Sequence, residues 1–221
     1  MAFIEITKSF ADVVVGVGTT AEKKQKLNNA TNIFINWIVQ TDNRWEIVSS
    51  GMYNDWAILK VLEWNGCGDT QMVIRPSTSS TYRRINMDYE CEIFWGSSWP
   101  VRYFKGDSWA MLGLPRDSTS ASTTHWRGAI TLEDDSVCAV RGNELYLNGV
   151  ELYACDFGAN LKDANGREVC TDAFLRDSNK TVVGKVKDGL AVRVTTSKNK
   201  IRVNNDIYFP VHYEYATLVM K

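Results

Sequence analysis

The sequence predicts an α+β fold that is mostly antiparallel β, with one main amphipathic helix near the N-terminus. Three observations lead to this prediction. A segment near the start of the chain combines a helix-start signal with apolar residues at helical spacing. Beyond residue 44 the apolar residues recur at a spacing of two, which is typical of strands. In the last part of the chain, Asn-Gly and Asp-Gly pairs mark tight turns between short apolar runs.

The helix is expected over residues 20–40. Thr19 and Glu22 have the spacing of a capping box, in which the N-cap hydroxyl and the N3 carboxylate satisfy backbone amides at the helix start. The apolar residues that follow fall on one predicted helical stripe: Leu27, Ala30, Ile33, Phe34, Trp37 and Ile38. Residues 3–17, before the helix, read as one or two short extended segments.

Alternating apolar residues predict a series of short strands after the helix. They are expected at residues 45–48, 56–62, 71–75, 86–94, 101–104 and 109–114, with a turn at 66–69. Two Ser/Thr-rich stretches, 77–81 and 118–124, read as loops. The second loop suggests a helix-plus-sheet domain at 1–125 and a C-terminal antiparallel β unit at 126–221, or else one continuous domain.

The best-defined local feature is a hairpin at Asn148-Gly149, because this pair favours a two-residue type I′ turn. That turn would pair Leu147 with Val150 and Leu145 with Leu152, which puts apolar side chains on one face. The pairs at 165–166 and 188–189 predict two further tight turns. Residues 207–215 read as a bent closing strand.

Composition restricts the possible partners. With 25 basic and 26 acidic side chains the formal net charge is −1, so there is no overall attraction to nucleic acid or to an anionic membrane. The N-terminus lacks the basic start and continuous apolar stretch of a secretory signal, and the apolar run at 13–17 is too short to cross a bilayer. We therefore expect a chain that folds in a cytoplasm, binds no nucleic acid and does not insert into a membrane.

The cysteines predict neither disulfides nor a metal site. There are five, an odd number, with no CxxC pair and only two histidines to accompany them. They are Cys67, Cys91, Cys138, Cys155 and Cys170. We expect reduced thiols that pack as small apolar groups, and no cofactor.

No residue pattern predicts catalysis. His125 lies beside a Ser/Thr-rich loop and His212 in an aromatic stretch, without a nucleophile motif near either. The acidic residues at 90–92 and 133–135 fit solvated strand and turn positions as well as a carboxylate pair. Gly16 and Gly18 precede the helix but lack the remaining glycines of a nucleotide-binding loop. We therefore expect that this protein is not an enzyme.

Aromatic residues are the strongest functional lead. The chain has eight Trp, nine Tyr and eight Phe beside four Pro, and tryptophan and tyrosine are enriched at protein interfaces. Four tryptophans cluster between or beside the two Ser/Thr-rich loops: Trp95, Trp99, Trp109 and Trp126. Three explanations remain open for them: an aromatic core, a subunit interface, or a carbohydrate-binding surface.

The order of motifs resembles that of tailed-bacteriophage virion structural proteins of the tail or baseplate kind. It follows the helix with WEIV at 45–48, NDWAILK at 54–60 and MVIR at 72–75, and then WPVRYFKGDSW at 99–109. The resemblance covers residues 20–115. It implies a non-enzymatic protein of the virion, assembled in the host cytoplasm, with itself as a homo-oligomer and other virion proteins as partners.

Two alternatives to a virion structural role belong to other functional classes, a binding module and an enzyme. One is a carbohydrate-binding module whose partner is a host-surface glycan. The other is a hydrolase built on a β scaffold, which would need a histidine or a pair of carboxylates converging in a pocket.

Overall fold

The computed structural model describes residues 3–10, 12, 16–77, 84–87, 91–94, 100–115, 124–142, 144–155, 170–192, 201–203, 206–212 and 217–221. Contacts between residues divide the chain into two compact units. Unit 1 contains residues 1–6, 103–112 and 126–221, and unit 2 contains residues 7–102 and 113–125. The sequence placed a boundary near 125, but it did not show that residues 1–6 and 103–112 belong with the C-terminal part.

The elements of unit 2 are one helix and a five-stranded sheet: α1 (Thr20–Thr41), β2 (Trp45–Met52), β3 (Ile58–Trp64), β4 (Cys67–Pro76), β5 (Arg84–Met87) and β6 (Cys91–Phe94). The twelve-stranded sheet forms most of unit 1: β1 (Ile4–Lys8), β7 (Val101–Lys105), β8 (Trp109–Pro115), β9 (Thr124–Thr131), β10 (Val137–Arg141), β11 (Glu144–Leu147), β12 (Val150–Cys155), β13 (Thr171–Arg176), β14 (Val182–Val192), β15 (Ile201–Val203), β16 (Asp206–His212) and β17 (Thr217–Met220). The predicted α+β class, with mainly antiparallel β, is confirmed.

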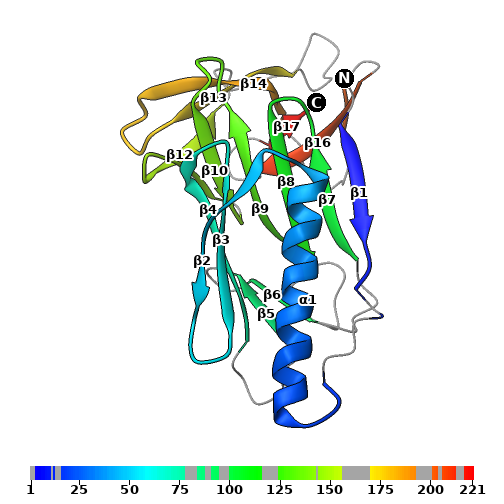
Figure 1. Cartoon of the computed structure of the whole chain (residues 1–221). Coiled ribbons are helices and arrows are strands. Elements are labelled where there is room, and N and C mark those ends of the chain that lie inside the picture. The colour runs from blue at the N-terminus through cyan, green and yellow to red at the C-terminus, as the bar shows by residue number, and fades with distance from the viewer. Residues whose placement is uncertain are drawn as a thin grey trace. The chain divides into compact units, whose positions relative to one another are not determined.

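Helix α1 begins as the sequence predicts. The Thr19 backbone N–H donates to Glu22 Oε2 at 2.7 Å and the Glu22 backbone N–H donates to Thr19 Oγ1 at 3.3 Å, so the capping box is complete. The bond from the Thr19 backbone holds the pKa of the Glu22 carboxyl below its usual value. Figure 1 shows α1 lying along the small sheet, where its contacts are mainly with β4.

The buried stripe of α1 differs from the predicted one. It contains Leu27, Ala30, Thr31, Phe34, Ile35 and Ile38. Ile33, expected in the stripe, keeps 52% of its surface exposed, and Trp37 is half-buried. At roughly 100° per residue, Ile33 lies about 130° round the helix from the centre of the observed stripe. The spacing of apolar residues is compatible with either stripe, and packing against the small sheet determines which one is buried.

In the small sheet the strands follow chain order, β2-β3-β4-β5-β6, all antiparallel. The β3–β4 turn falls at Asn65-Gly66, with φ of 49° and 71°, and not at the predicted 66–69, of which 67–69 already belong to β4. The expected single strand at 86–94 is wrong. Residues 84–87 and 91–94 are two paired strands, with Met87 opposite Cys91.

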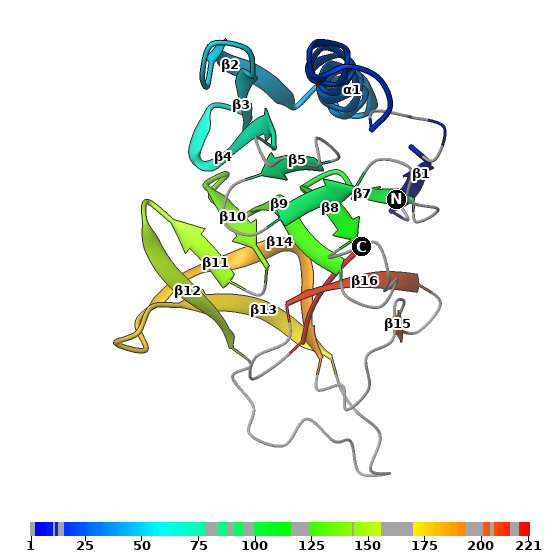
Figure 2. The same ribbon diagram turned by 90° about the horizontal axis from the view of Figure 1, so that it is seen from below.

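The predicted Asn148-Gly149 hairpin is confirmed. Asn148 and Gly149 have φ of 52° and 75°, and β11 pairs with β12 with Leu147 opposite Val150 and Leu145 opposite Leu152. Within unit 1, Figure 2 shows β10 to β14 as a strongly bent run of neighbouring strands. Leu145 and Leu152 face the core of this unit, whereas Val150 at the tip is exposed.

The predicted turn at 188–189 is wrong, because both residues lie inside β14. Asp188 has a φ of 57° there. The pairing of β14 with β13 shifts between the Lys185 and Leu190 positions, which is the signature of a bulge. The predicted turn at 165–166 and the second half of the predicted closing strand, residues 213–215, lie outside the described residues.

Candidate functional site

The structure describes two of the four tryptophans of the predicted cluster. Trp95 and Trp99 lie outside the described residues. Trp126 is half-buried, with its ring centroid 5.3 Å from that of Phe209. Trp109 is completely buried within unit 1. The structure therefore brings only Trp109 and Trp126 into one described cluster.

Trp109 is a core residue, which corrects its assignment as an interface or glycan candidate. Its ring stacks on Phe209 at 5.6 Å with an interplanar angle of 13°, and its Nε1 donates to the Lys221 backbone oxygen at 2.8 Å. Phe3 packs against both rings, and Phe104 stacks on Phe209. With none of its surface exposed, Trp109 has nothing to present to a partner. Residue type alone could not distinguish this role from an interface role, since both favour large aromatic rings.

The acidic turn at 133–135 forms surface ion pairs. Glu133 binds Lys185 at 2.8 Å and Asp135 binds Lys187 at 3.0 Å, and these bonds raise the pKa of both lysines. Ser136 donates to Asp134 from its hydroxyl and backbone, which lowers the pKa of that carboxyl. The turn therefore matches the solvated alternative. Of the other groups weighed for catalysis, the histidine side chains and residue 90 lie outside the described side chains.

Metal-ligand groups and membrane-spanning helices are absent from the described residues. Among the described residues, no group of three or more His, Cys, Asp or Glu side chains is arranged to hold a metal ion. Cys138 is buried and Cys67 and Cys170 are half-buried, and burial is the main cause of the raised pKa of the Cys67 thiol. Within the same described residues, no helix combines the length and hydrophobicity that spanning a bilayer requires.

An uncovered edge strand is the first candidate surface. β2 ends the small sheet, and all of its residues after Trp45 are exposed. Its apolar side chains remain outside the core: Ile47 is 40% exposed, Val48 47% and Met52 57%. The register shift between Ile47 and Ser49 marks a bulge at Val48. The sequence identified this strand but gave no sign that its apolar side chains face outward.

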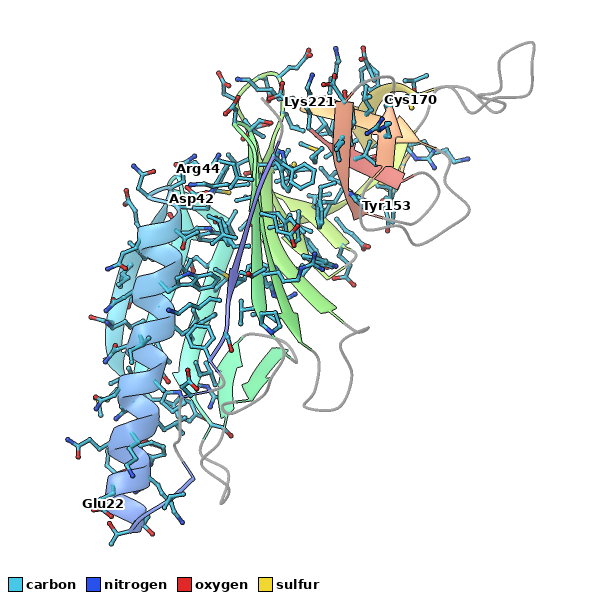
Figure 3. The ribbon with its side chains drawn as sticks, turned by 90° about the vertical axis from the view of Figure 1, so that its right-hand side faces the viewer. Glu22, Asp42, Arg44, Tyr153, Cys170 and Lys221 are labelled. Carbon is cyan, nitrogen blue, oxygen red and sulfur yellow. The ribbon has the colours of Figure 1, made fainter. Side chains whose placement is uncertain are left out.

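Two ordered features support β2. At its start, Arg44 Nε and NH2 donate to the two carboxylate oxygens of Asp42 at 2.8 and 2.6 Å, and the guanidinium lies 4.9 Å from the Trp64 ring centroid. Figure 3 labels this pair at the end of α1 opposite Glu22. At its far end, the Tyr53 backbone N–H donates to the Ala57 oxygen at 2.7 Å. β2 is therefore anchored at both ends while its length is exposed.

A hollow in unit 1 is the second candidate. It has a volume of about 260 Å³ and is lined by Tyr153, Arg176, Asp177, Ser178 and Lys180. Tyr153 of β12 is labelled in Figure 3 and lies opposite Arg176 of β13 in the sheet register. Sequence patterns could not identify this group, because its members come from two strands and a turn separated by a long intervening segment.

Comparison with known proteins adds no relative: no family model, no curated protein and no solved structure matches this chain.

Proposed function

We propose that this chain is a non-enzymatic structural protein of a tailed-bacteriophage virion, a tail or baseplate component that acts by binding copies of itself and other virion proteins. The motif resemblance over residues 20–115 supplies the virion context. The observation that carries the proposal is the uncovered edge of β2. An edge strand presents unpaired backbone groups that pair readily with another strand, and proteins usually protect such edges with charge or proline.

The sequence of β2 suits pairing with its own copy. Glu46 is its only charged residue, and it contains no proline. Antiparallel pairing about a two-fold axis between Ser49 and Ser50 places Ile47 opposite Met52 of the second copy. Like charges do not meet in that arrangement, and the exposed apolar side chains cover one another. In this register the bulge at Val48 lies opposite Gly51 of the second copy.

The test is the mass of the protein in solution. Ile47→Lys and Met52→Lys each place a charge on the proposed contact, and Val182→Lys is the control because Val182 is similarly exposed, at 43%, in unit 1. Light scattering on the wild type should give an oligomer that the first two variants weaken and the control preserves. A monomeric wild type that binds no virion protein would refute the assembly role. An oligomer insensitive to both β2 variants would refute the β2 contact.

The virion context has a separate test in the genome. The genes flanking this reading frame should encode tail or baseplate proteins. Flanking genes for polysaccharide degradation or transport would instead favour the carbohydrate-binding alternative.

A further inference from the structure

We infer that the hollow between β12, β13 and the turn at 177–180 is a binding site for an acidic saccharide, in which a carboxylated sugar ring lies against Tyr153 and its carboxylate is bound by Arg176 and Lys180. This inference does not depend on the proposed assembly role.

The sheet fixes two of the side chains on its outer face. Leu152 and Ala154 are buried, so Tyr153 between them points to the opposite side of β12. Leu175 is buried in the same way, and Arg176 follows it on the outer side. Because Tyr153 and Arg176 are register partners, their side chains are cross-strand neighbours. Both are half-buried and line the hollow.

The turn fixes the backbone that carries the remaining side chains. Asp177 Oδ1 accepts the backbone N–H groups of Asn179 and Thr181, each at 2.9 Å. The Asp177 backbone N–H donates to the Thr181 backbone oxygen, and the Lys180 backbone N–H donates to the Asp177 backbone oxygen, at 3.0 Å each. One carboxylate oxygen of Asp177 is thus committed to the turn, which fixes the backbone positions of Ser178 and Lys180.

Charge distinguishes this hollow from the surrounding surface. Lys185, Lys187 and Lys221 of the same unit each bind a carboxylate, at 2.6–3.0 Å. Within the part of the chain that the structure describes, no ion pair involves Arg176 or Lys180, and both line the hollow beside Tyr153. Two unpaired cations in one depression favour an anionic ligand, and the guanidinium fork matches a carboxylate or a phosphate.

The remaining groups favour a carboxylated sugar over a phosphate. Asp177 lines the hollow, and its charge opposes a dianion more strongly than a monoanion. The Ser178 hydroxyl and the second Asp177 oxygen are partners for sugar hydroxyls. The volume of about 260 Å³ is below the roughly 300–1,000 Å³ of pockets for drug-sized ligands, which limits the ligand to about one ring. An aromatic side chain provides an apolar surface for such a ring.

The test is a titration of the full chain with glucuronic acid, followed by saturation-transfer NMR, with glucose as the neutral control and inorganic phosphate as the anion control. Glucuronic acid should bind saturably, and both controls should bind at least tenfold more weakly. Arg176→Gln and Lys180→Gln should each weaken glucuronic acid roughly tenfold, since hydrogen bonds to charged groups are lost. Arg202→Gln, at an exposed arginine of β15, should have no effect.

Each contrary result overturns a stated part of the inference. An absence of saturable binding up to about 10 mM refutes the site, because even weak single-sugar binding is measurable there. Equal binding of phosphate or of glucose refutes the acidic-sugar class. If the Arg176 and Lys180 variants bind as the wild type does, the location is wrong. Circular dichroism of each variant separates loss of binding from loss of folding, and Lys180 lies on an exposed turn where substitution leaves the core intact.

Discussion

Three glycines allow a controlled test of how the two Asn-Gly hairpins are stabilised. Gly66 and Gly149 occupy the second turn position of the β3–β4 and β11–β12 hairpins, with φ of 71° and 75°. Gly68 lies two residues after Gly66, in β4, and its φ is outside the left-handed region. An added Cβ meets no atom within 4 Å at any of the three positions. Substitution there changes backbone energetics without causing a clash.

The magnitude follows from those backbone angles. Valine at Gly66 or Gly149 must adopt a left-handed conformation, which costs an L-residue about 1–2 kcal/mol. Valine at Gly68 stays extended, and it removes the roughly 0.5–1 kcal/mol that glycine costs within a strand. The free energy of unfolding of Gly66→Val should therefore be about 1.5–3 kcal/mol below that of Gly68→Val.

Equilibrium unfolding in urea is the appropriate assay, because Gly66 and Gly68 belong to the same unit and report on one transition. With a slope of about 1–3 kcal/mol per molar urea, the two midpoints should differ by roughly 1 M. Gly149→Val should lower the stability of unit 1 by the same 1–2 kcal/mol. Equal midpoints for Gly66→Val and Gly68→Val would refute the reasoning, since they differ only in backbone conformation.

Other predictions concern the core, a buried ion pair and pH. Trp109→Ala should lower the unfolding free energy by about 3–5 kcal/mol, whereas an interface residue would change the oligomer mass and leave the fold stable. Asp42→Ala should lower the free energy of unfolding by roughly 3 kcal/mol. This is the lower end of the range for a broken buried ion pair, because the Arg44 side chain stays 20% exposed. An unchanged midpoint in urea would contradict this prediction. The hydrogen bond to Glu144 raises the Tyr146 pKa to about 12. The hydrogen bond stabilises the folded protein below pH 10, which is about the pKa of tyrosine in the unfolded chain. This stabilisation is lost as the pH rises from about 10 to about 12. Ultraviolet titration of Glu144→Ala should show one fewer tyrosine ionising near 12 than the wild type, and identical curves would disprove the link.

The amino-acid sequence by itself determined the features whose energy is confined to a few adjacent residues. The capping box at Thr19 needs only Glu22 three positions on, and the hairpin at Asn148-Gly149 needs only a dipeptide that tolerates positive φ. The same dipeptide at Asn65-Gly66 marks the β3–β4 turn, so this turn was also readable, one residue before the predicted position. The predominance of strands follows from the two-residue spacing of apolar residues, and their antiparallel pairing follows from the tight-turn signals.

Only the tertiary structure decided which apolar surfaces are covered. Ile33 satisfied the helical pattern but lies outside the stripe that packs on the sheet. Trp109 packs against Phe3 and Phe209, each about a hundred positions away in the chain. Burial depends on such distant partners, so no local pattern assigns a tryptophan to core or to interface.

The candidate sites also depended on contacts distant in the chain. The exposure of β2 is a property of its place at the edge of a sheet, which its own residues do not encode. Tyr153 and Arg176 become neighbours only through the register of β12 with β13. Asp188-Gly189 was predicted as a turn between strands. Because β14 pairs with β13 and with β17, these residues instead form a bulge within β14. In each case the physical reason is the same: local residues set the backbone preferences, and long-range strand pairing decides which side chains meet.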